Sequence, residues 1–119
     1  MAGLLRVMGN SDTTFRDGPL TFKVEQAGDA LMLRASGELS RSTAERFEAE
    51  LRRAIHGDAS TVVLDLSGVG FIDSAGLRSV LRIANLSPRN GGRLRMRNAS
   101  APVHQAIEWG GLERLVPLV

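Results

Sequence analysis

The stretch from Thr61 to Leu66 limits the possible folds more than any other part of this 119-residue chain. It reads Thr-Val-Val-Leu-Asp-Leu, a run rich in β-branched side chains in which polar and apolar positions do not alternate. Such a run is typical of a strand that is covered on both faces, as in the middle of a parallel sheet. Because parallel neighbours are joined by crossovers, we expect this strand to lie between helical segments.

A helix is expected before this strand, between Ser42 and Gly57. Its apolar residues fall on one helical face, while glutamates and arginines occupy the other. Ser42 and Glu45 fit a capping box at its start, and Gly57 fits its end. We interpret three of the acidic side chains as part of a solvated helix face: Glu45, Glu48 and Glu50.

Two more helices are expected after the central strand. The first follows Asp73, with Ser74 in the N-cap position, and ends before Pro88. The second begins at Ser100 and ends at Gly110. The inward-facing residues expected for the first of these helices are Leu77, Val80, Leu81 and Ala84.

Shorter stretches are expected as further strands. Residues 20–25 and 31–35 alternate in polarity and are joined by Gly28-Asp29, which predicts a hairpin. Residues 93–97 alternate as well, and a short last strand is expected at 115–116. The order β-β-α-β-α-β-α-β predicts a single α/β domain, a mixed sheet with helices packed on it and right-handed crossovers.

The domain is expected to span residues 19–119, after a flexible N-terminal leader of residues 1–18 that is rich in turn-forming residues. No apolar run approaches the roughly 20 residues that cross a bilayer, and no secretory signal pattern is present. We therefore expect a cytoplasmic protein without membrane contact.

Composition and motifs argue for a binding protein and against an enzyme. The chain has no cysteine, which excludes disulfides, thiolate metal sites and cysteine nucleophiles. Neither a metal nor a cofactor is expected, because no ligand spacing or nucleotide motif is complete, and 68–70 is interpreted as a turn. A nucleophile elbow at Ser74 would need glycine where Ile72 stands, and His56 and His104 lack the other members of a triad.

The high isoelectric point, about 10.4 at a net charge of only +2, is weak evidence for nucleic acid. It arises because fourteen of the fifteen basic residues are arginine and tyrosine is absent. We favour edge-strand protection as the role of Arg93, Arg95 and Arg97, since no aromatic residue is interleaved for base stacking. No nucleic acid is therefore expected as a partner, and a nucleic-acid-binding module that uses these three arginines, with Arg89, is the lesser alternative.

The most informative segment runs off the central strand into the next helix, from Leu64 to Leu77, as Leu-Asp-Leu-Ser-Gly-Val-Gly-Phe-Ile-Asp-Ser-Ala-Gly-Leu. In open α/β sheets, ligands and partners bind at the carboxyl edge of the strands. Small residues at 75 and 76 would let another molecule approach the backbone. Taken alone, Ser74 is most simply explained as a helix cap.

Together with residues 33–39, 42–44, 91–94 and 110–115, this segment resembles the STAS domain and, within it, the bacterial anti-sigma factor antagonists. The resemblance implies a phosphorylation switch at Ser74. The anti-sigma factor, a Ser/Thr kinase that holds ATP-Mg, would phosphorylate it, and a metal-dependent phosphatase would remove the phosphate. The unphosphorylated protein would sequester the anti-sigma factor and release a sigma factor. The partner-binding residues implied are Glu38, Leu39, Ser40, Asp73, Ser74, Ala75 and Gly76.

One residue departs from the family pattern: Ser40 stands where the family usually has aspartate after Gly-Glu-Leu. We interpret Ser40 as a solvated loop residue, with a second phosphate acceptor as the alternative. A non-switching STAS scaffold or sensor subunit is the alternative to the switch itself. A monomer or weak dimer is expected.

Overall fold

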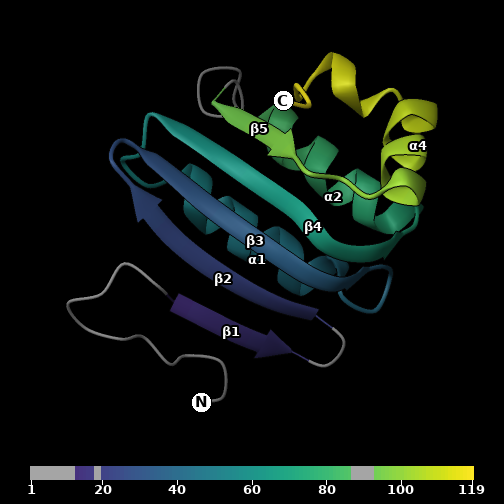
Figure 1. The fold of residues 1–119 in the computed structure, drawn as a ribbon, viewed down its shortest axis with the longest axis horizontal. Coiled ribbons are helices and arrows are strands. Elements are labelled where there is room, and N and C mark those ends of the chain that lie inside the picture. The colour runs from purple at the N-terminus through teal and green to yellow at the C-terminus, as the bar shows by residue number, and fades with distance from the viewer. Residues whose placement is uncertain (1–12, 18–19, 87–92) are drawn as a thin grey trace.

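The β-branched run that begins at Thr61 forms part of the longest strand of a mixed sheet (Figure 1). The computed structural model describes residues 13–17, 20–86 and 93–119. The strands are β1 (Thr13–Asp17), β2 (Leu20–Ala27), β3 (Ala30–Leu39), β4 (Thr61–Ile72) and β5 (Leu94–Arg97). The helices are α1 (Ala44–Ile55), α2 (Ser74–Leu86), α4 (Ala101–Gly110) and the 3-10 turn η1 (Leu112–Arg114).

Within the described residues the strand order is β1-β2-β3-β4-β5. β1, β2 and β3 pair antiparallel, whereas β3, β4 and β5 run parallel. Helices α1 and α2 lie together behind one face of this sheet, and α4 packs beside the end of β4 (Figure 1). This arrangement confirms the predicted α/β domain. No helix in the described part of the chain is long and apolar enough to cross a membrane.

The core fills the space between the sheet and its helices. Phe22 of β2 stacks on Phe47 of α1, with the ring centroids 6.1 Å apart and the planes 13° from parallel. Alternate residues of the strands point to this side, which explains why one face of each strand is buried. Other fully buried core residues include Leu20, Leu33, Leu51, Ile55, Leu64, Ile83 and Leu94.

Two predictions about helix faces are wrong. Glu50, expected on the solvated face, is only 6% exposed and lies 3.6 Å from the Nε of Arg46. Leu81, expected to point inward, is 37% exposed, and Ile83 takes the core position instead. The apolar residues of α2 spread over too wide an arc for all of them to face one sheet.

The structure also corrects three boundaries. Residues 68–70, interpreted as a turn, continue β4, because Gly68 lets the strand pass close to Ser36 at a bulge. The last strand is not at 115–116: η1 precedes that stretch, and Leu118 forms a single parallel bridge with Met96. Thr13–Asp17, inside the expected leader, pairs with β2 as an additional strand.

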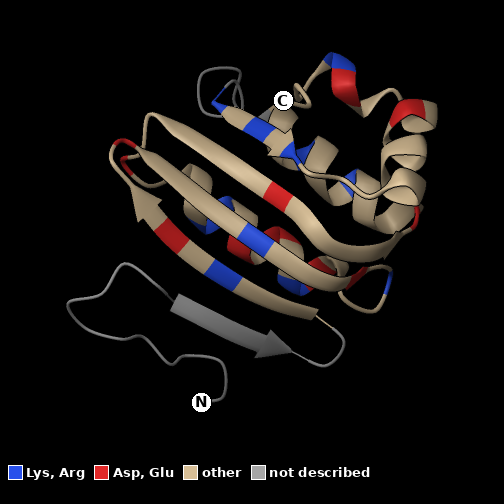
Figure 2. Ribbon diagram, viewed as in Figure 1, with Lys and Arg blue, Asp and Glu red and all other residues tan. Residues whose placement is uncertain are grey.

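Charged residues form a row across the sheet face that the helices leave open (Figure 2). Lys23, Arg34, Asp65 and Arg97 occupy matched register positions on β2, β3, β4 and β5. Arg97 lies 4.0 Å from Asp65, and the outer edge of β5 is covered because Val119 donates its N–H to the carbonyl of Met96. Of the β5 arginines, Arg97 is thus paired with an acidic residue of the domain.

Asp65 is the centre of this row and is only 1% exposed. Its Oδ1 accepts the N–H of Ser67 at 2.9 Å, while its Oδ2 accepts from Asn98 at 3.3 Å and from Arg34 at 3.4 Å. Burial by itself raises the pKa of Asp65, but the hydrogen bonds from Ser67 and Asn98 and the charge of Arg34 outweigh it. The pKa of Asp65 is therefore held below its ordinary value of 3.8.

We predict that Asp65→Asn lowers the free energy of unfolding at neutral pH by about 1–3 kcal/mol, since hydrogen bonds to a charged acceptor are lost. Because the pKa of Asp65 is depressed on folding, its contribution is full above the unfolded pKa and is lost as the pH falls toward the folded pKa. The wild type should thus lose stability below about pH 4, and the variant should lose less of it. Urea unfolding at several pH values measures this, with exposed Asp58→Asn as the control. Identical pH profiles for wild type and Asp65→Asn would contradict the assignment.

Candidate functional site

The carboxyl ends of β3 and β4 bring two distant segments of the chain to one edge of the sheet. The two strands are parallel and end in register, with Leu39 opposite Ile72. After β3 the chain enters the 40–43 loop, which precedes α1, and after β4 it enters α2. All seven residues expected at a partner site lie on these two segments, so the structure brings them together.

Asp73 joins the two segments through its backbone and its carboxylate. Its N–H donates to the carbonyl of Leu39 at 3.1 Å, and its Oδ2 accepts the N–H of Arg41 at 3.1 Å. Its Oδ1 accepts the N–H groups of Ala75 at 2.9 Å and Gly76 at 3.1 Å. The same carboxylate therefore caps α2 and fixes the loop after β3.

The cap of α2 is thus Asp73, and the prediction that Ser74 occupies this position is wrong. A carboxylate accepts two N–H groups and complements the positive end of the helix dipole, which a hydroxyl does less well. Ser74 becomes the first helical residue. It is exposed, and among the described residues no hydrogen-bond partner of its hydroxyl is found.

The predicted capping box of α1 is also absent. The residue before this helix is Thr43, which makes no side-chain cap. Its Oγ1 instead accepts the N–H of Ser40 at 3.0 Å and donates to the carbonyl of Glu38 at 2.8 Å. The hydroxyl of Ser42 lies 3.1 Å from that of Ser40. Thr43 therefore shapes the 40–43 loop, a role that no local sequence pattern predicted.

The seven residues differ in how a partner could reach them. Glu38 and Ser74 are exposed, Asp73 and Ala75 are half-buried, and Ser40 is only 9% exposed. The interpretation of Ser40 as a solvated loop residue is therefore wrong. Leu39 is fully buried and Gly76 is buried, so these two residues pack beneath the exposed ones and are not on the surface.

Gly76 is required by the close approach of α2 to the end of β3. A Cβ on this residue would lie 2.4 Å from the carbonyl oxygen of Leu39, which is backbone and has little freedom to move. The expectation that Gly76 admits another molecule is wrong, because the space is taken by β3.

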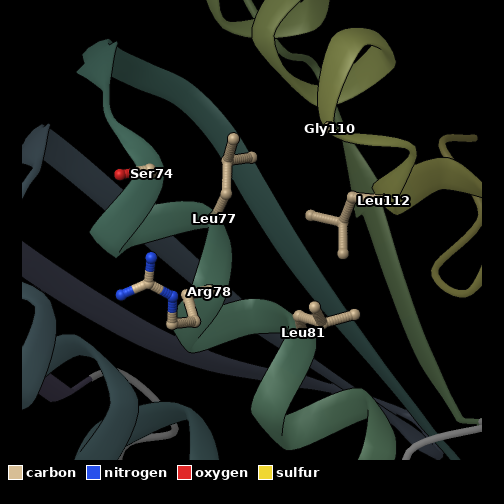
Figure 3. A pocket seen from close by; sticks show the side chains of 6 residues that line it. All are labelled: Ser74, Leu77, Arg78, Leu81, Gly110 and Leu112. Carbon is tan, nitrogen blue, oxygen red and sulfur yellow. The ribbon is translucent and has the colours of Figure 1, made fainter.

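A shallow groove lies beside Ser74, between α2 and the turn that follows α4 (Figure 3). It has a volume of about 170 Å³ and is lined by Ser74, Leu77, Arg78, Leu81, Gly110 and Leu112. Leu77, Leu81 and Leu112 converge on it, while the Ser74 hydroxyl and the Arg78 guanidinium lie on the other side of α2. We call this the α2–α4 groove. The over-wide apolar arc of α2 was the signal in the sequence that could have revealed it.

The two histidines lie apart from this site, His56 at the end of α1 and His104 within α4. No group of three or more histidine, aspartate or glutamate side chains that could hold a metal ion occurs among residues 13–17, 20–86 and 93–119. The arrangement at Ser74 offers an exposed hydroxyl, a capped helix and an apolar groove. It is suited to contact with another protein.

The family model, the similar sequences and the similar structures point to the same group of proteins. Residues 22–117 match the family model described as "Mlab, STAS domain". An anti-sigma F factor antagonist from Paenibacillus polymyxa is 29% identical over 100 residues, which cover 83% of this chain and 86% of the relative. An anti-sigma factor antagonist from Mycobacterium paratuberculosis has a similar structure, with a TM-score of 0.73, 27% identity and coverage of 83% and 84%. The unphosphorylated form of the antagonist SpoIIAA has a TM-score of 0.66 at 25% identity, with coverage of 82% and 87%.

We predict that Gly76→Ala lowers the free energy of unfolding by about 1–3 kcal/mol, because the new methyl group overlaps a backbone carbonyl. Gly70→Ala is the matched control, since a Cβ at that position meets nothing within 4 Å. Urea unfolding of both variants measures the difference. Equal stability of the two variants would contradict the described contact between α2 and β3.

Proposed function

Since the chain belongs to the STAS domain family, we propose that it is an anti-sigma factor antagonist whose partner contact is controlled by phosphorylation of Ser74. The partner is an anti-sigma factor with Ser/Thr kinase activity, which itself binds ATP-Mg, and a metal-dependent phosphatase reverses the modification. The unphosphorylated protein sequesters the anti-sigma factor and so releases a sigma factor. The protein acts by binding and carries no catalysis of its own. The binding module is the domain of residues 19–119, to which β1 adds an edge strand.

The observation that carries this proposal is that Asp73 caps α2 while the neighbouring Ser74 hydroxyl stays exposed. Asp73 holds the N-terminal N–H groups of α2, so the Ser74 hydroxyl is not needed to keep the turn folded. Ser74 is exposed, whereas nearby Thr43 and Ser79 are buried and hydrogen-bonded within the domain. A kinase can therefore phosphorylate the Ser74 hydroxyl without disturbing the fold.

A phosphate at this position can weaken binding through its charge alone. It adds about −1.5 to −2 charge beside the Asp73 carboxylate. At a close interface this charge must be desolvated and is repelled by any acidic group of the partner. A hundredfold loss of affinity corresponds to only about 2.7 kcal/mol. No large conformational change is required.

We predict that incubation with the cognate anti-sigma kinase and ATP-Mg places one phosphate on the chain, at Ser74. Ser74→Ala should abolish the labelling, and Ser42→Ala, at an exposed serine of the neighbouring loop, should leave it unchanged. Mass spectrometry of the digested protein measures both. Intact binding with no phosphate, or with phosphate only at Ser40 or elsewhere, would refute the switch and leave the non-switching scaffold.

The α2–α4 groove extends the proposed contact surface from Ser74 over exposed apolar side chains. Leu81 is 37% exposed there, and the groove is continuous with Ser74. Exposed apolar groups next to a polar, modifiable residue are typical of protein interfaces, where the apolar part supplies affinity. A phosphate at the rim of the groove would then weaken an interface whose binding free energy comes mainly from apolar contacts in the groove.

We predict that Leu81→Ser weakens binding to the anti-sigma factor about tenfold, or about 1.4 kcal/mol, because apolar area is lost from the interface. Leu115→Ser is the control, since Leu115 is 49% exposed but does not line the groove. Calorimetric titration of both variants gives the two affinities. If both variants bind as tightly as the wild type, the groove lies outside the interface.

A further inference from the structure

Arg78 lies one helical turn after Ser74 on the same side of α2, and we propose that it is the positioning residue that pairs with the phosphate of phosphorylated Ser74. This inference rests on the proposed function. Figure 3 shows the Ser74 hydroxyl and the Arg78 guanidinium on one side of the helix, away from the leucines of the α2–α4 groove. Residues four apart on a helix are neighbours, and an anion that precedes a cation by four residues has the favoured orientation.

The guanidinium of Arg78 is available for this pairing. Within the described residues Arg78 is exposed and has no hydrogen-bond or ion-pair partner. Its neighbours on the same face of the domain are already engaged: Arg82 donates to Glu48 at 2.7 Å, and Arg52 donates to the same carboxylate at 2.9 Å. Arg78 is thus the cation of α2 that remains unused beside Ser74.

Three of the N–H groups in the first turn of α2 are already engaged. The N–H groups of Ala75 and Gly76 are taken by Asp73 Oδ1, and that of Leu77 donates to the Asp73 carbonyl at 3.0 Å. A phosphate beside the Asp73 carboxylate therefore needs a cation from a side chain. A guanidinium forms paired, charge-assisted hydrogen bonds with phosphate oxygens, which fixes the direction of the group as well as reducing its repulsion.

Arg78 is the basic residue that lies one helical turn from Ser74 on the same helix. Asp73 and Glu38 are acidic and oppose a phosphate. Arg41 is a second exposed arginine near the site, but it lies on the 40–43 loop, where its backbone N–H is bound to Asp73 Oδ2. The facing wall of the groove contributes Gly110 and Leu112, which carry no charge. The pair therefore holds the phosphate on the polar side of α2, at the rim of the groove.

The test uses the full chain with phosphoserine inserted at position 74 during translation, so no kinase is required. The second pKa of the phosphate, near 6 for a free phosphoserine, is followed by ³¹P NMR titration. Arg78 should favour the dianion, so that Arg78→Gln raises this pKa by about 0.3, a twofold change in proton affinity. Arg78→Lys should restore part of the shift, since it keeps the charge and loses the paired geometry.

Arg53→Gln is the control, because Arg53 is an exposed arginine near the opposite end of the neighbouring helix α1. It should leave the phosphate pKa unchanged, and about 1 M salt should erase the effect of Arg78→Gln. An equal phosphate pKa in wild type and Arg78→Gln would overturn the pairing while leaving phosphorylation by the kinase intact. A raised pKa in Arg78→Gln supports the pairing even if the kinase does not modify Ser74, so the two proposals fail separately.

Discussion

The Asp73 carboxylate is the contact on which the candidate site depends. It binds the first turn of α2 through one oxygen and the loop after β3 through the other. The parallel pairing of β3 and β4 places both segments at one edge, and Asp73 then holds them in a single arrangement. Since this carboxylate performs the capping, the neighbouring hydroxyl is left for other chemistry.

Much of the architecture could be predicted from sequence because it follows from periodicity. The run at 61–66, rich in β-branched residues, predicted the central strand β4, although α1 and α2 cover one face of the sheet and not both as expected. Gly28, with a φ of 61°, marked the hairpin between β2 and β3. The residues of the candidate site were also predicted to lie at one edge of the sheet, as the structure shows, because strand ends and helix starts are local signals. The resemblance to the STAS domain supplied the proposed role of Ser74, which no periodicity could supply.

The errors arose where tertiary contacts overrule local rules. Ser74 and Ser42 both look like helix caps, but Asp73 caps α2 and Thr43 precedes α1 with its hydroxyl directed to the loop. Gly76 looked like an opening for a partner, whereas the carbonyl of Leu39 occupies that space. Leu81 lies in the α2–α4 groove because the apolar arc of α2 is too wide for the sheet alone, and Glu50 is buried beside Arg46 of its own helix.

These features make Ser74 an exposed hydroxyl on a rigid support, bordered by an apolar groove on one side and by Arg78 on the other. In the proposed switch, binding and modification are controlled at this one point while the domain stays folded. The most direct measurement is a calorimetric titration of the cognate anti-sigma kinase with the unmodified chain and with the chain carrying phosphoserine at position 74. The account predicts tight binding of the unmodified chain and at least about a hundredfold weaker binding of the phosphorylated chain. Equal affinities would contradict it.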